Sequence, residues 1–187
     1  MENVSGNLSK TEYRIRAKSN GEPQFYRFDK PEDERFPKMI ELFSRTNYLL
    51  QEENGLTPIH IDDSVSSLSA ILLNDAYYQA LMDGREIMRG ISVLKPEWII
   101  PFKAKAWLDL REKKDVDSSD IKKHRNDIIR IVSDMVLQKC ILPDEVRKDM
   151  EKFIEQFDVT ESELKNLKIR GTKPEDIKRV LQTTYLD

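Results

Sequence analysis

Short runs of alternating or β-branched hydrophobic residues dominate the first half of the chain. Such runs, bounded by glycine, proline and asparagine, are typical of β-strands. Five segments have this signature, the first three of them most clearly: residues 24–28, 38–44 and 58–62, then residues 13–17 and 86–94. The pattern therefore predicts a strand-rich region up to residue 94.

One segment inside this region has a helical pattern instead. Over residues 64–83, hydrophobic side chains recur three or four positions apart, which is the spacing of one helix face. Asp63 or Ser64 is in place to cap the start of this helix, and Gly84 to stop it. We therefore expect a helix between the strands.

From Pro96 onward the spacing is helical throughout. It predicts helices over residues 96–114, from Asp117 or Ser118 to about residue 137, and over residues 143–157. The capping boxes Thr160-x-x-Glu163 and Thr172-x-x-Glu175 predict two short helices. The sequence thus predicts an α+β fold, with a strand-rich portion over residues 1–94 and a helical portion over residues 95–187, packed as one unit.

Composition narrows the classes of function. The chain has 187 residues, a net charge of -3, one cysteine and two histidines, so a disulfide framework and a zinc ribbon are both excluded. No hydrophobic run approaches the ~20 residues of a membrane helix, and we expect a cytoplasmic protein with no membrane partner. The near-neutral charge also argues against a dedicated nucleic-acid-binding protein, and no DNA binding is evident.

Glu41 breaks the hydrophobic pattern of its predicted strand. Alternation places it on one face with Met39 and Phe43. Such a carboxylate either pairs with an arginine such as Arg27 on a neighbouring strand or faces a cleft and binds Mg²⁺. A two-metal site needs about three carboxylates, and no hydrophobic strand here carries an Asp-x-Asp pair.

Lys103 breaks the hydrophobic stripe of the helix predicted over residues 96–114. It lies four residues after Ile99 and four before Trp107. Its side chain either extends from the buried stripe to solvent or contacts a phosphate or a nucleobase.

His124 and Arg125 are polar residues predicted to face inward on the next helix. Because an unpaired inward charge is unfavourable, we expect a partner such as Asp127, Asp109 or Glu41. Cys140, at the end of a hydrophobic helix, fits a packed thiol better than a nucleophile.

A resemblance to a known family rests on five segments: FYRF, PKMIELFSR, DDSVSSLSAILLNDAYYQALMDG, IPFKAKAWLDL and DSSDIKKHRNDI. Together they resemble bacterial nucleotidyltransferase-like proteins of the AbiEii type, the toxin-side proteins of abortive-infection systems. The resemblance implies a partial nucleotidyltransferase-type mixed sheet followed by a C-terminal helical bundle. It also implies transfer of a nucleotide from an NTP to RNA or protein with Mg²⁺.

The resemblance also implies roles for individual residues. Glu41 matches the third catalytic carboxylate and metal ligand of the family, and Lys103, followed by Ala106, matches a catalytic lysine that contacts the nucleotide. Arg125 and Asp127 match a nucleotide-binding signature.

The front of the family pattern has no counterpart in this sequence. A Gly-Gly or Gly-Ser turn and an Asp-x-Asp strand would precede residue 13, and neither is present. We therefore expect weak catalysis or none. The alternative is a non-catalytic interaction module of a toxin-antitoxin or abortive-infection system, and the sheet edge left exposed by missing strands would favour a homodimer or an antitoxin-like partner.

Overall fold

The computed structural model describes residues 13–17, 21, 23–44, 56–59, 68–112 and 118–187. The contacts divide the chain into two compact units, Met1–Asp75 and Ala76–Asp187. The second unit includes a helix and a hairpin that the sequence-based division at residue 94 grouped with the strand-rich portion.

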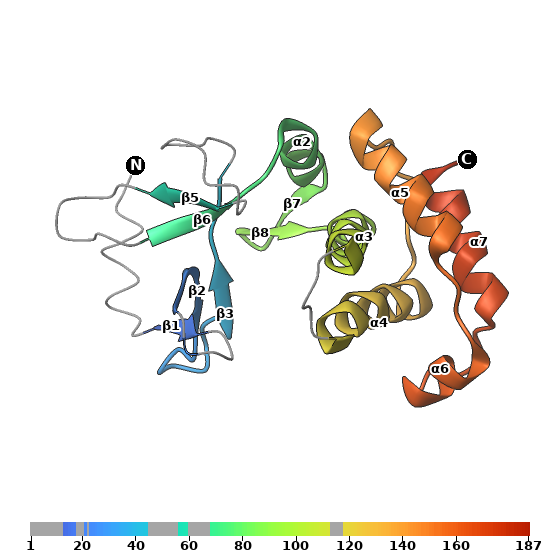
Figure 1. Ribbon diagram of the computed structural model, residues 1–187, viewed down its shortest axis with the longest axis horizontal. Coiled ribbons are helices and arrows are strands. Elements are labelled where there is room, and N and C mark those ends of the chain that lie inside the picture. The colour runs from blue at the N-terminus through green and yellow to red at the C-terminus, as the bar shows by residue number, and fades with distance from the viewer. Residues whose placement is uncertain (1–12, 18–20, 22, 45–55, 60–67, 113–117) are drawn as a thin grey trace. The chain divides into compact units, whose positions relative to one another are not determined.

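The described strands of the first unit form two three-stranded sheets (Figure 1). One is antiparallel, in the order β1 (Arg14–Ala17), β2 (Pro23–Asp29) and β3 (Met39–Glu41). The other is mixed, because its central strand β6 (Leu68–Leu72) runs parallel to β4 (Phe43–Ser44) and antiparallel to β5 (Leu56–Ile59). These strands confirm the predictions over residues 13–17, 24–28 and 38–44, the last as two short strands.

The helix predicted over residues 64–83 is wrong in its first half. Residues 68–72 form β6, and the helix α2 covers only Asp75–Asp83. A short hydrophobic run fits both a buried strand and a helix face, and here pairing with β4 and β5 selects the strand. The predicted caps Asp63 and Ser64 lie outside the described residues. The predicted stop is confirmed, because the Gly84 N–H donates to the carbonyl of Ala80 at 3.0 Å after the last helical residue.

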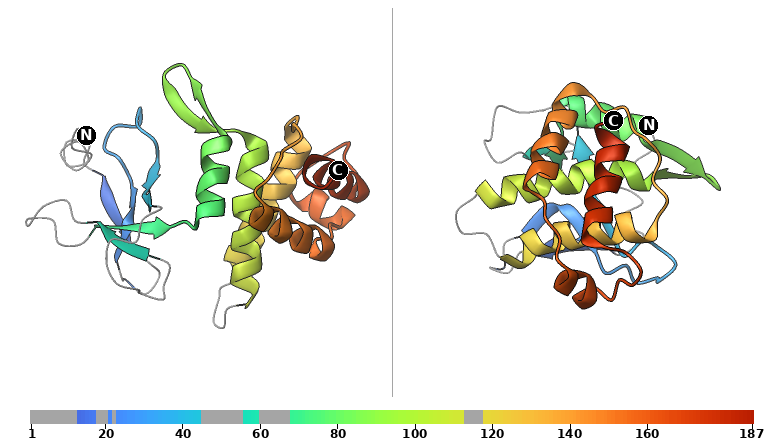
Figure 2. Two further views of the ribbon diagram at one scale, coloured as in Figure 1. Left: turned by 90° about the horizontal axis from the view of Figure 1, so that it is seen from above. Right: turned by 90° about the vertical axis from the view of Figure 1, so that its right-hand side faces the viewer.

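A hairpin follows α2 in the second unit. Its strands β7 (Arg85–Met88) and β8 (Ile91–Leu94) pair antiparallel and project from the helices in Figure 2. The two turn residues, Arg89 and Gly90, have positive φ angles of 52° and 80°. Two positive values identify the tight turn that matches the twist of a hairpin. The segment over residues 86–94, predicted as strand, is therefore two strands and a turn.

Five further helices complete the second unit: α3 (Pro96–Glu112), α4 (Ser118–Asp134), α5 (Asp144–Gln156), α6 (Glu161–Asn166) and α7 (Pro174–Tyr185). Helix α3 packs against α4 and α5, and α7 packs against both of these helices. The core includes an aromatic cluster in which the Phe153 ring lies 5.3 Å from Trp107 and 4.5 Å from Phe157, centroid to centroid. The α+β class is therefore confirmed. Of the predicted cap positions for α4, Asp117 lies outside the described residues.

One of the two predicted capping boxes is confirmed. Thr160 caps α6, and its side chain and that of Glu163 bond reciprocally to backbone N–H groups. The second box is displaced by one residue, because Lys173 and not Thr172 precedes α7 and its N–H donates to Asp176 at 3.2 Å. Proline fits the first helical position, so Pro174 sets the start of α7. None of the described helices is both long and hydrophobic enough to cross a membrane.

Candidate functional site

Glu41 forms an ion pair with Arg27. The two residues lie directly opposite each other on β3 and β2, and the Arg27 Nε donates to the carboxylate. Both side chains are about three-quarters buried, with 24% and 28% of their area exposed. A cross-strand pair of opposite charge contributes about 0.2–1 kcal/mol to the sheet. This contact confirms the structural alternative considered for Glu41.

A magnesium site needs more carboxylates than the described residues place around Glu41. In the described ranges no three His, Cys, Asp or Glu side chains lie together as ligands of one ion. Since two-metal phosphoryl transfer relies on such a group, these residues do not fit the metal that the resemblance implies. The roles of Glu41 as metal ligand and catalytic residue stay predictions, and we derive no step through magnesium.

Lys103 and Asp127 contact each other across two packed helices. The Lys103 Nζ on α3 lies 2.6 Å from the Asp127 Oδ2 on α4, and the two side chains are 25% and 28% exposed. The lysine thus leaves its hydrophobic stripe to reach a carboxylate. The structure brings together two residues that the resemblance singled out, and their nucleotide-binding roles stay predictions.

Arg125 binds a helix that sequence reasoning did not connect with it. Its guanidinium donates to both carboxylate oxygens of Glu163, at 3.0 Å for the Nη2–Oε2 contact, and also to the carbonyl of Asp158. The guanidinium carbon lies 5.4 Å from the Phe157 ring centroid, a cation–π distance. The expectation of Asp127, Asp109 or Glu41 as partner was therefore wrong, because the capping box of α6 holds Glu163 against Arg125.

The ion pair with Arg125 changes the pKa of Glu163. Hydrogen bonds from Arg125, and secondarily from Thr160, lower the pKa of Glu163, although its burial acts in the opposite direction. A carboxylate held in this way stays ionised at neutral pH. The contact ties α4 to the start of α6.

His124 is half-buried beside these ion pairs. In the described part of the chain its Nδ1 is buried without a hydrogen-bond partner, so the partner expected for this residue is not seen there. Burial lowers the pKa of the imidazole, and the nearby charges of Lys103 and Lys123 lower it further. The ring is therefore neutral at pH 7.

A polar cluster joining α2, α3 and α5 was missed by sequence reasoning. The Tyr77 Oη donates to the Asp149 Oδ2 at 2.9 Å, and the Lys105 Nζ lies 3.0 Å from Asp109 and 3.6 Å from Asp149. The four-residue spacing of Lys105 and Asp109 was visible in the sequence, but their contact with α5 was not.

Cys140 is 6% exposed, and burial raises the pKa of its thiol to about 12, so it is a packed, unreactive thiol.

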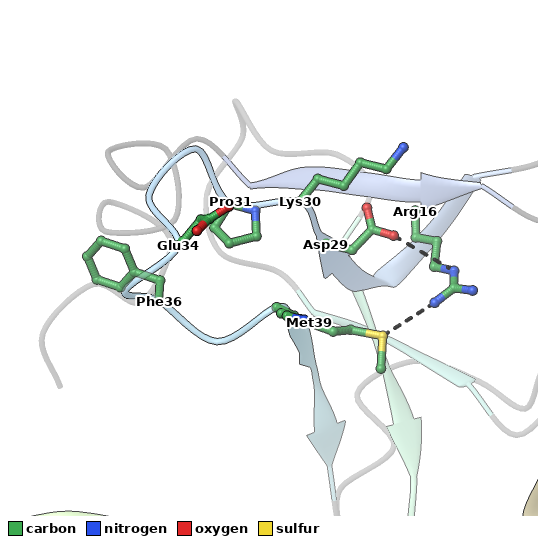
Figure 3. A pocket seen from close by; sticks show the side chains of 8 residues that line it. Arg16, Asp29, Lys30, Pro31, Glu34, Phe36 and Met39 are labelled. Carbon is green, nitrogen blue, oxygen red and sulfur yellow. Dashed lines mark hydrogen bonds and ion pairs between the residues drawn. The ribbon is translucent and has the colours of Figure 1, made fainter.

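Two open hollows of about 610 Å³ each lie on the surface. The hollow in the first unit has walls of mixed charge, and across it Arg16 contacts Asp29 and the Met39 sulfur (Figure 3). The hollow in the second unit is lined by three cations and one hydrophobic side chain: Lys165, Lys168, Arg170 and Ile169.

The hairpin β7–β8 exposes its hydrophobic side chains. Ile87, Met88 and Ile91 have 72%, 56% and 67% of their area exposed.

Comparison of the chain with protein-family models, with curated proteins and with solved structures finds no match.

Proposed function

We propose that this protein is a non-catalytic protein-interaction module that associates with a second copy of itself through the hairpin β7–β8. The observation that supports the proposal is the exposure of Ile87, Met88 and Ile91 on a hairpin that projects from its unit (Figure 2). Neighbouring exposed hydrophobic side chains of this kind mark interaction surfaces in soluble proteins. The resemblance to abortive-infection proteins suggests the biological setting.

Both faces of the hairpin carry hydrophobic residues. Met88 lies opposite Ile91 on one face, which Val93 shares, whereas Ile87 lies opposite Ser92 on the other face. Among the described strands, β7 and β8 pair only with each other, so each retains an edge with backbone groups able to accept another strand. A two-stranded hairpin is marginally stable alone, and pairing with another strand would stabilise it.

The base of the hairpin is fixed to the helices. The Lys95 N–H donates to the carbonyl of Gly84 at 3.0 Å. A Cβ at residue 84 would lie 2.3 Å from the Trp98 Cγ and 2.8 Å from a methyl group of Leu94. Only glycine therefore allows this approach, which packs the base of the hairpin against Trp98.

Self-complementarity favours a second copy as the partner. Ile87 lies near the middle of β7 and has 72% of its area exposed. If two β7 strands pair antiparallel about a twofold axis at Ile87, the Ile87 side chain of one copy lies directly opposite that of the other and packs against it. The same residue then makes the contact in both copies, as in the interface of a twofold dimer.

Size-exclusion chromatography with light scattering, over a range of concentrations, tests the proposal on the full chain. We expect a dimer that Ile87→Lys and Ile91→Lys each dissociate. The matched control is Val136→Lys, because Val136 is 94% exposed but lies between α4 and α5. A wild-type chain that stays monomeric, or a dimer that the hairpin variants leave intact, would refute the proposal.

A second candidate function, nucleotide binding, rests on Lys103 and Asp127, two of the three helical residues that the resemblance implies at a nucleotide, which lie in contact with each other. Calorimetry with Mg-ATP, Mg-CTP and Mg-GTP tests it. Binding that Lys103→Ala weakens and Lys148→Ala leaves unchanged would support this function, because Lys148 is an exposed lysine on α5. Binding of none of the three nucleotides would exclude it.

A further inference from the structure

The end of α6 has a specific hydrogen-bonding pattern. The N–H of Ile169 donates to the carbonyl of Leu164 at 2.9 Å, and the N–H of Lys168 donates to the carbonyl of Lys165 at 3.0 Å. Lys168 has a φ of 61°. These contacts form a Schellman motif, whose left-handed position is usually occupied by glycine.

Lysine is an unfavourable residue at this position. A side chain in the left-handed region is destabilised relative to glycine by contact of its Cβ with the following carbonyl. The chain nevertheless has Lys168 there and places Gly171, with a φ of 79°, three residues later. Unfavourable backbone conformations of this kind gather at functional sites, which makes the surroundings of the Lys168 side chain worth considering as a binding site.

The Lys168 side chain lines the second unit's hollow together with Lys165 and Arg170. All three cations are exposed, and no ion pair joins any of them to an acidic group within the described ranges. The fourth lining residue, Ile169, is half-buried. The hollow thus gathers three positive charges whose mutual repulsion an anion would relieve.

We propose that this hollow binds a short chain of phosphate groups, either an inorganic polyphosphate or the phosphates of a nucleotide. Its volume of about 610 Å³ lies within the range of about 300–1,000 Å³ typical of small-ligand sites. Lysine and arginine form strong, charge-assisted hydrogen bonds with phosphate oxygens. Several closely spaced negative charges match three cations better than a single carboxylate does.

Lys168→Gly is the decisive variant, because it removes a cation and at the same time relieves an unfavourable backbone conformation. A variant of this kind separates binding from folding. We expect its affinity for phosphate chains to fall about tenfold, as loss of one charge-assisted contact implies, while its stability toward urea stays equal or rises. Arg170→Gln should weaken binding similarly, and Lys148→Gln on α5 is the matched control.

Calorimetry of the full chain with tripolyphosphate, ATP and adenosine identifies the ligand. Equal affinity for tripolyphosphate and ATP would assign the site to the phosphate chain alone, whereas tighter binding of ATP would assign it to a nucleotide. The inference is overturned if neither phosphate compound binds, if adenosine binds as well as ATP, or if binding is lost in Lys103→Ala but kept in Lys168→Gly. The last result would instead support the second candidate function.

Discussion

Replacement of Glu163 by glutamine tests the structural role assigned to Arg125. The Glu163 carboxylate accepts hydrogen bonds from the Thr160 N–H at 2.9 Å and from the Arg125 Nη2 at 3.0 Å. Glutamine retains an oxygen for the capping box but loses the charge that Arg125 faces. A hydrogen bond to a charged group contributes about 1.5–3 kcal/mol when shielded from solvent. Because the Glu163 side chain is 33% exposed, solvent screening reduces the expected loss in the free energy of unfolding to about 1 kcal/mol.

The pH dependence of this loss gives a sharper test. Since the folded state lowers the pKa of Glu163 below its ordinary value of 4.5, the ionised carboxylate stabilises the fold above that value. The contribution disappears as the pH falls through the lowered pKa. The stability difference between wild type and Glu163→Gln is therefore expected to be full at neutral pH and to shrink in acid below 4.5.

Urea unfolding followed by circular dichroism measures both effects. Glu161→Gln is the control, because Glu161 is an exposed residue in the same first helical turn. A double-mutant cycle with Arg125→Met should give a coupling free energy of about 1 kcal/mol between Arg125 and Glu163. A coupling near zero, or a stability difference that is the same in acid as at neutral pH, would show that the ion pair does not join α4 to α6.

Three other substitutions have expected outcomes that urea unfolding can check. Gly84→Ala places a methyl group 2.3 Å from the Trp98 Cγ and should destabilise by about 1–3 kcal/mol, with faster amide exchange in the hairpin; unchanged stability and exchange would contradict the tight contact. Phe153→Ala removes a fully buried ring and should cost about 3–5 kcal/mol, so a loss below 1 kcal/mol would contradict its place in the core. Lys103→Met leaves the Asp127 carboxylate without its lysine and should cost about 1 kcal/mol, which adding Asp127→Asn should recover; no recovery would argue against the ion pair.

Local signals explain where the sequence-based fold prediction succeeded. The strands at residues 13–17 and 24–28 were bounded by turn residues, and Pro96 marked the start of α3. The segment at 68–72 was misassigned because its hydrophobic residues fit two periods, and only pairing with β4 and β5 distinguishes them. Such pairing depends on residues distant in the sequence, which a local pattern does not contain.

The same limit applies to the candidate residues. The contact of Glu41 with Arg27 could be predicted, because both lie on strands that neighbour each other along the chain. Arg125 and Glu163 are 38 residues apart, and nothing local connects a helix face to a later capping box. The hollow at the end of α6 had a visible signal in its closely spaced cations followed by Gly171. The net charge of the C-terminal half did not show this cluster, because acidic residues elsewhere in that half balance the positive charges.

Three cations with positive φ angles differ in their surroundings from the cations that the sequence singled out on helices. Lys30, Arg89 and Lys168 are the described non-glycine residues with positive φ, and at each of these positions glycine or asparagine would be more stable. Lys30 lines the hollow of Figure 3, Arg89 forms the tip of the hairpin, and Lys168 lines the proposed phosphate site. The cations that the sequence singled out on helices, Lys103 and Arg125, instead connect neighbouring helices through carboxylates. A phosphate group at Lys168 therefore meets a charge that no carboxylate in the described part of the chain neutralises, whereas a nucleotide at Lys103 would compete with Asp127 for the lysine, and the variants Lys168→Gly and Lys103→Ala distinguish these two modes of binding.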